Sequence, residues 1–160
     1  MEELFLWIRN LISREFAIFI AAMLPVTELR GAIPLAVSWG ISPVQAFWLA
    51  FIGNLVPVIP LLILLDPVTE LLRKIPIFDR FFEWLYARTL RKSDRVKKYG
   101  AIGLIFFTAV PLPTTGAWTA SLAATIFKIR FKWAFLAIST GVLIAGIVIT
   151  LLSAGIITVF

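Results

Sequence analysis

The chain has 160 residues, of which 61% are hydrophobic and 15% charged, and its formal net charge is +6. A soluble domain is about 45–50% apolar, so an excess gathered in long runs indicates an integral membrane protein. The absence of Cys and His excludes thiol redox chemistry, His-based zinc sites and His-dependent catalytic triads. The basic residues flank hydrophobic runs, which favours a membrane over nucleic acid as the partner.

Residues 1–15 carry apolar side chains at helical spacing between charged ones and predict an amphipathic helix at the membrane interface, without a cleavable signal peptide. A polar linker, 66–99, divides the rest of the chain into two hydrophobic parts. In these parts the stretches 42–65 and 133–160 exceed the about 20 residues that a helix needs to cross a bilayer. Both are predicted to be transmembrane helices.

The other two hydrophobic stretches, 16–39 and 100–127, are broken near their middle by proline-rich segments, 25–34 and 111–116. Each interior proline costs a helix about 3 kcal/mol. Arms of about ten residues span about 15 Å, which is half of the hydrocarbon thickness. We therefore predict two re-entrant hairpins with non-helical tips. The prolines expected at these tips are Pro25, Pro34, Pro111 and Pro113.

The two halves, 16–65 and 100–160, thus repeat the order of hairpin and span. The predicted fold is an all-α integral membrane protein, in which an inverted repeat of re-entrant helical hairpin plus transmembrane helix is joined by a cytoplasmic amphipathic linker. Most of the 15 Lys and Arg lie in 66–99 and 128–132, which places these segments in the cytoplasm and both termini outside. The alternative is four ordinary, kinked spans in the cell membrane, with the termini inside and 128–132 outside.

Glu28 and Arg30 are the only charged residues within the hydrophobic stretches, and an ionisable group at membrane depth is a functional candidate. On an extended tip, side chains two residues apart point the same way, here into one cavity. Arg30 could then bind a phosphate with its planar guanidinium, and Glu28 could carry a proton. The alternative is that the two charges only neutralise each other.

The second tip is uncharged but rich in hydrogen-bonding groups, and helix N-termini near both tips favour an anion. The alternative roles are capping for the threonines and packing for the tryptophan, while Asn54 either caps a tip or joins the cavity. The candidate substrate- or proton-binding residues are Glu28, Arg30, Thr27, Gly31, Thr114, Thr115, Gly116, Trp118, Thr119 and Asn54. No catalytic residue, metal ligand or cofactor is expected.

At the segments 27–34 and 111–119 the sequence resembles the paired signatures of the small multidrug export protein family, which is similar to the DedA (VTT-domain) superfamily. The resemblance covers nearly the whole chain. It implies a two-hairpin fold and a transport role, since DedA relatives are associated with lipid scrambling, polyprenyl-phosphate recycling and dependence on the proton-motive force. Glu28 matches the acidic position of the first hairpin, whereas the arginines that DedA proteins carry in the second hairpin are missing here.

The leading functional hypothesis is a small transporter or flippase for an amphipathic, anionic or lipid-linked substrate, with proton coupling and a midplane site. Cation or multidrug efflux through Glu28 is one alternative, and a non-transporting membrane assembly factor is another. An enzyme is not expected, because a single buried carboxylate without His or Cys leaves little for catalysis. The expected partners are membrane lipids, the substrate and further copies of the chain, which would cover the hairpins.

Overall fold

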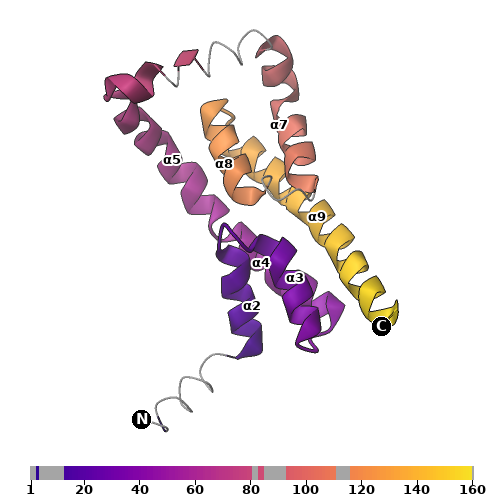
Figure 1. Ribbon diagram of the computed structural model, residues 1–160. Helices are drawn as coiled ribbons and strands as arrows, with labels where there is room; N and C mark the ends of the chain where they lie inside the picture. Colours follow the sequence, from indigo (N-terminus) through magenta and orange to yellow (C-terminus); the bar gives the residue numbers. More distant parts are fainter. Residues whose placement is uncertain (1–2, 4–12, 81–82, 85–92, 111–115, 160) are drawn as a thin grey trace. The chain divides into compact units, whose positions relative to one another are not determined.

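The computed structural model in Figure 1 describes residues 3, 13–80, 83–84, 93–110 and 116–159. The named elements of this part are all helices, which confirms the all-α class. They are α2 (Arg14–Met23), α3 (Glu28–Ser38), α4 (Pro43–Leu55), α5 (Val58–Arg73), α7 (Ser93–Ala109), α8 (Ala117–Ile126) and α9 (Phe131–Val159). The predicted interfacial helix falls mostly on residues outside the described ones.

Two stretches of helix are long and apolar enough to cross a membrane, Pro43–Arg73 with 31 residues and Phe131–Gly155 with 25. They correspond to the two predicted spans. The segments Gly100–Ala109 and Ala117–Ile126 are apolar but much shorter. Two long apolar helices beside several short ones are typical of a membrane protein, although the position of the short helices in a bilayer stays a prediction.

The first hairpin consists of α2 and α3, which pack against each other and against α4. Ser13 begins α2, because its Oγ accepts a hydrogen bond from the Phe16 amide at 3.2 Å. The helix ends at Leu24, whose backbone is extended, as expected for a residue that precedes a proline. A four-residue connection, 24–27, then leads into α3.

Pro34 does not lie in the tip, as the sequence suggested, but inside α3. The ring removes one hydrogen bond and costs about 3 kcal/mol. Close packing of one face of α3 against α2 and α4 offsets that cost. The buried apolar residues of α3 are Leu29, Ala32, Ile33, Ala36 and Val37. The helix therefore continues through the proline, and the non-helical tip is shorter than predicted.

The first predicted span, 42–65, is interrupted near Pro57. α4 ends at Leu55, and α5 begins at Val58 with Pro57 as its N-cap. Pro60 falls in the first turn of α5, where its missing N–H leaves no intrahelical bond unmade. The helix then runs beyond residue 65, the predicted end of the span, and through Pro67 to Arg73. The end of α5 and the start of α7, which begins at Ser93, thus lie within the predicted linker, 66–99.

The described helices belong to two compact units. The first, Met1–Val56 with Leu143–Phe160, holds α2, α3, α4 and the C-terminal part of α9. The second, Pro57–Val142, holds α5, α7, α8 and the N-terminal part of α9. In the second unit α8 packs against both α5 and α7. Each unit thus contains one pair of short helices, α2 with α3 or α7 with α8. It also contains the first part of the long apolar segment that follows this pair and the last part of the other long apolar segment.

The same local geometry occurs at one helix end in each unit. After α3, the Ile41 amide donates to the Ala36 carbonyl at 3.0 Å; after α8, the Ile129 amide donates to the Ala124 carbonyl at 2.9 Å. Both bonds close a Schellman-type helix end. The residues of the two turns can therefore be aligned position by position, with Ile41 opposite Ile129, and the same alignment continues into α4 and α9. We call this alignment the shared register.

Two glycines at equivalent positions of this register let helices approach closely. A Cβ atom added at Gly53 of α4 would lie 2.6 Å from the Phe19 carbonyl oxygen of α2. A Cβ added at Gly141 of α9 would lie 2.5 Å from Thr108 Cβ of α7. Ordinary carbon contacts are about 3.5–4.0 Å, so only glycine fits at either crossing. Small residues at such points are typical of helix packing in membranes.

The interior combines many alanines with branched apolar side chains such as Ile18, Ile33 and Ile138. The fully buried alanines are Ala22, Ala32, Ala36, Ala46, Ala50, Ala117, Ala120, Ala124 and Ala134. Many of the bulkiest apolar side chains lie on the outside, among them Phe16, Trp48, Phe106, Trp133 and Leu151. This distribution suits a chain that is surrounded by lipid, since large apolar groups gain little there from being turned inward.

Candidate functional site

The connection between α2 and α3 places a carboxylate at the start of α3. The Glu28 amide donates to the Leu24 carbonyl at 2.9 Å, and the Gly31 amide donates to the Thr27 carbonyl at 2.8 Å. Pro25 is exposed, and Val26 is 95% exposed. The tip is therefore an apolar projection, and the charged residues lie just behind it on the first turn of α3.

Glu28 is both buried and conformationally strained. Its side chain is only 7% exposed, and its backbone has a φ of 46°. A non-glycine residue in this left-handed region costs about 1–2 kcal/mol. Burial of an ionisable group adds to that cost unless a partner compensates it. Strain and burial in one residue are features that accumulate at functional sites.

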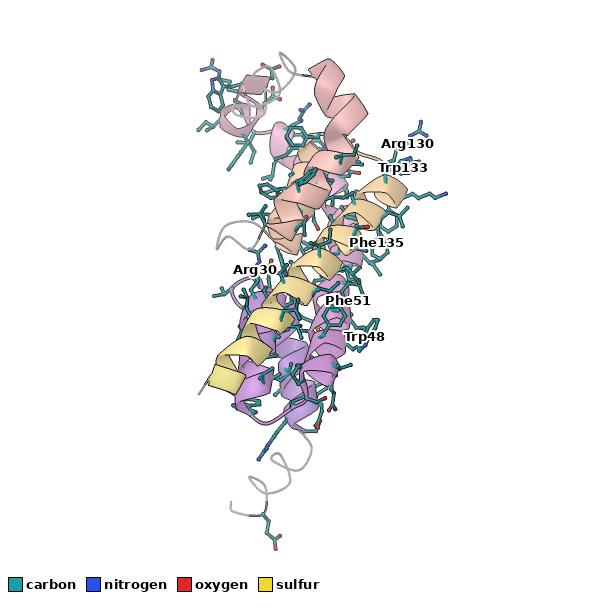
Figure 2. The ribbon with its side chains drawn as sticks, turned by 90° about the vertical axis from the view of Figure 1, so that its right-hand side faces the viewer. Arg30, Trp48, Phe51, Arg130, Trp133 and Phe135 are labelled. Atoms are coloured by element: carbon teal, nitrogen blue, oxygen red, sulfur yellow. The ribbon has the colours of Figure 1, made fainter. Side chains whose placement is uncertain are left out.

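Arg30 provides a compensating charge. Its guanidinium is partly buried and interacts electrostatically with Glu28, and Figure 2 labels the residue on the first hairpin. The extended tip that the sequence suggested is wrong, because both residues are helical. The two charges attract each other at the first turn of α3.

Thr27 and Gly31 fit together beside this pair. A Cβ added at Gly31 would lie 2.6 Å from Thr27 Cγ2. Gly31 therefore leaves room for the threonine methyl group. Thr27 is the N-cap of α3 but makes no capping hydrogen bond with its side chain. Hence these two residues shape the start of α3, and capping does not occupy the Thr27 hydroxyl.

Asn54 of α4 is the most unusual buried polar residue of the first unit. Its side chain has no exposed surface. Among the residues that the structure describes, neither its Oδ1 nor its Nδ2 has a hydrogen-bond partner. An unpaired buried amide costs about 1–3 kcal/mol. The sequence reasoning singled out Asn54, but it proposed a cap or a cavity group, and the described residues show no cap.

The second hairpin uses its polar groups to begin α8. The Gly116 amide donates to Thr119 Oγ1 at 2.9 Å, and this hydroxyl donates to the Gly116 carbonyl at 3.1 Å. Thr119 therefore caps the helix, as the alternative interpretation expected. Trp118 is partly buried. The predicted tip residues Pro111, Pro113, Thr114 and Thr115 lie outside the described part of the chain, and their roles stay predictions.

The two hairpins differ in chemistry at matching positions. The register that relates Ile41 to Ile129 also relates Arg30 to Trp118 and Gly31 to Thr119. In this register an arginine of α3 thus corresponds to an indole of α8. The charged pair belongs to the first hairpin alone, so the two hairpins are not chemically interchangeable.

A pocket of about 390 Å³ lies away from this pair and is lined by Arg14 and Trp39. Arg14 Nη1 donates to the Trp39 carbonyl at 3.2 Å. Arg14 begins α2 and Trp39 ends α3, so this bond closes the open end of the hairpin. Since the pocket lies at the end opposite to Glu28, we do not assign it to the charged site.

Two hydroxyls that the sequence reasoning missed are buried without a partner among the described residues. They are Ser139 Oγ and Thr150 Oγ1, both on α9. A hydroxyl within a long apolar helix is the only signal that the sequence contains for them. The described residues hold no group of three or more His, Cys, Asp or Glu that could bind a metal ion.

Comparison with known families identifies the relationship of this chain. A family model described as "Putative small multi-drug export protein" matches residues 28–148, which is more than half of the chain. The chain belongs to this family. The small multi-drug export match begins at Glu28 and contains Arg30 and Asn54, whereas Pro25 and Thr27 lie before it.

No curated protein and no solved structure matches the chain. The family relationship therefore rests on the small multi-drug export match, and the similarity to DedA proteins stays a prediction. Together with the apolar helices, the match indicates a membrane protein with a role in export. It leaves the substrate and the mechanism to be argued from the residues.

Proposed function

We propose that this protein is a small membrane transporter that moves an amphipathic substrate with an anionic group, using Glu28 and Arg30 as its central polar pair. One observation carries the proposal: at the start of α3, Glu28 is buried, has a strained backbone, and interacts electrostatically with the partly buried guanidinium of Arg30. A pair that served only the fold could be replaced by apolar residues at little cost. Glu28 and Arg30 are the only charges in the apolar stretch 16–39, which favours a functional role.

The pair offers a simple mechanism based on charge neutrality. In an apolar environment Glu28 and Arg30 compensate each other, and an added anion would leave one uncompensated negative charge. If the substrate anion takes Arg30, neutrality is restored when Glu28 accepts a proton. One proton would then accompany each anion. Arg30 suits this exchange because guanidinium binds carboxylate and phosphate oxygens with two parallel hydrogen bonds.

The position of Glu28 supports the same exchange. The N-terminus of a helix carries a partial positive charge that favours anions. Glu28 is the first residue of α3, so its carboxylate occupies the place that a substrate anion would prefer. Asn54 adds an unused donor and acceptor in the same unit. It could hydrogen-bond to an uncharged part of the substrate headgroup.

The name of the family favours a second candidate, the export of cationic drug-like molecules. Glu28 would then attract the cation directly, and Arg30 would be dispensable. The two candidates differ in their prediction for one substitution. Loss of Arg30 should abolish transport of an anion but spare export of a cation.

The test uses proteoliposomes that contain wild type, Glu28→Gln, Arg30→Gln or Arg14→Gln. Arg14 lies on the same hairpin but is exposed, so its variant is a matched control for the loss of one arginine. Translocation of a fluorescent anionic lipid, export of a lipophilic cation and proton flux are followed in parallel. We expect Arg30→Gln to lower anion movement at least about tenfold, which corresponds to about 1.4 kcal/mol.

The remaining variants separate the interpretations. Glu28→Gln should allow residual anion movement without a proton signal, and Arg14→Gln should match wild type. Cation export that survives Arg30→Gln but not Glu28→Gln would favour the second candidate. Equal rates in all four proteins would refute a transport role for the pair and favour an assembly factor.

A further inference from the structure

The turn between α8 and α9 carries three exposed basic side chains. α8 ends at Ile126 and α9 begins at Phe131. Lys128 and Arg130 lie in the turn and Lys132 in the first turn of α9, and all three are exposed. We call residues 128–133 the basic corner. A high positive charge density at the start of a long apolar helix raises the question of what it binds.

The equivalent turn of the first repeat shows that the fold does not need these charges. The turn between α3 and α4 has the same helix-closing hydrogen bond, from the Ile41 amide to the Ala36 carbonyl. In the shared register its residues Gly40, Ser42 and Val44 replace Lys128, Arg130 and Lys132. The α3–α4 turn therefore has the same geometry without any of these charges, whereas the α8–α9 segment carries three cations.

Lys128 occupies a backbone conformation that favours glycine. Its φ is 51°, and its counterpart Gly40 has a φ of 82°. A left-handed residue at a helix C-terminus is usually glycine, because a Cβ is disfavoured there. The first repeat uses glycine, whereas the second keeps a lysine at a strained position. Local stability does not explain this lysine, so its charge requires another explanation.

The surroundings of the basic corner indicate a membrane surface. Ile129 anchors the turn, since its Cδ1 lies 3.2 Å from where a Cβ would stand at Gly100 of α7. Phe131 and Trp133 are 45% and 56% exposed. Figure 2 shows Arg130 and Trp133 at the same end of α9. Exposed aromatic and basic side chains together are typical of the region where lipid headgroups meet the hydrocarbon.

We propose that the basic corner binds the headgroups of anionic phospholipids. The three cations complement the lipid phosphates, while Phe131 and Trp133 contact the upper acyl chains. A soluble phosphate compound would use the cations but would gain nothing from the exposed aromatic rings. The proposal is independent of the transport role, because none of these residues belongs to the Glu28–Arg30 pair.

The test measures which lipids stay with the purified protein in mixed micelles of phosphatidylglycerol and phosphatidylcholine. Retained lipids are quantified by mass spectrometry, and enrichment is the phosphatidylglycerol share relative to the input. The neutral variant replaces the corner bases by glutamine: Lys128→Gln, Arg130→Gln and Lys132→Gln. Each base near a lipid surface contributes about fivefold in affinity. We therefore expect the neutral variant to lower the enrichment at least about fivefold.

Two control variants separate a specific site from overall charge. The first keeps the charge of the corner through Lys128→Arg, Arg130→Lys and Lys132→Arg. The second removes three bases elsewhere through Arg73→Gln, Lys74→Gln and Arg80→Gln. Both should retain most of the enrichment. A loss in either control as large as in the neutral variant would overturn the proposal, as would an unchanged neutral variant.

Two further measurements address the strained lysine and the source of the phosphate. Lys128→Gly should raise the thermal midpoint of the protein and lower phosphatidylglycerol enrichment at the same time. A lower midpoint would show that Lys128 supports the fold and would contradict the proposal. An excess of soluble glycerol phosphate should leave lipid retention unchanged. Effective competition would instead identify a site for free phosphate compounds.

Discussion

The crossing of α7 and α9 at Gly141 allows a quantitative test of the packing. In Gly141→Ala the new methyl group would lie 2.5 Å from Thr108 Cβ, 2.9 Å from the Ile105 carbonyl oxygen and 3.2 Å from the Ala109 amide nitrogen. Two of these atoms belong to the backbone, so no change of rotamer can remove the overlap. The two helices must move apart instead.

The expected change in stability is the sum of two opposing effects. Overpacking of this kind costs about 1–3 kcal/mol. Alanine is a better helix former than glycine by about 0.8–1 kcal/mol. Gly141→Ala should therefore lower the free energy of unfolding by up to about 2 kcal/mol. Gly103 of α7 has no atom within 4 Å of an added Cβ, so Gly103→Ala should only gain helix propensity.

Reversible unfolding of both variants in mixed detergent micelles, followed by circular dichroism, gives the difference directly. We expect Gly141→Ala to be about 1–3 kcal/mol less stable than Gly103→Ala. Gly53→Ala should behave like Gly141→Ala, because its Cβ would lie 2.6 Å from the Phe19 carbonyl oxygen. Equal stability of the crossing variant and the Gly103 variant would refute the close approach of the helices.

Three further predictions concern buried polarity, topology and backbone strain. Asn54→Leu should raise the free energy of unfolding by about 1–3 kcal/mol while lowering transport, since it removes an unpaired amide; a loss of stability in denaturation assays would show that the amide has a structural partner. The chain has no native cysteine, so Ser42→Cys and Arg130→Cys can be labelled singly with a membrane-impermeant maleimide. An inverted repeat places them on opposite sides of the bilayer, whereas four ordinary spans place them on the same side. Glu28→Asn should have a free energy of unfolding about 0.5–1 kcal/mol higher than that of Glu28→Gln, because asparagine tolerates a left-handed backbone. Equal midpoints of the two variants in thermal unfolding would contradict the backbone strain at Glu28.

The all-helical class and the interruptions at proline were predictable from local sequence. Pro25 ends α2, and Pro57 marks the break between α4 and α5, because proline acts directly on its own backbone and on the preceding residue. Pro34 misled the prediction, which placed it in the tip, and Pro67 likewise did not end its helix. Both lie inside helices, since neighbouring residues supply enough helix-stabilising interactions to outweigh a single lost hydrogen bond.

The candidate site was predictable in composition but not in conformation. Glu28 and Arg30 stood out because charges within apolar stretches are rare. Their placement at the start of a helix depends on where the turn closes. In the structure it closes with the hydrogen bond from the Glu28 amide to the Leu24 carbonyl. The positive φ of Glu28 and the unpaired amide of Asn54 arise from tertiary packing. No periodicity or motif in the sequence encodes them.

The alanine interior has a consequence for engineering. Because alanine and glycine make many of the buried contacts while bulky side chains such as Trp48, Phe106 and Trp133 are exposed, internal fit and solvent preference depend largely on separate sets of residues. A water-soluble analogue could be designed by replacing outward apolar side chains with polar ones, leaving every helix crossing unaltered. In most soluble proteins the two properties cannot be changed separately in this way, because the largest apolar side chains also form the interior.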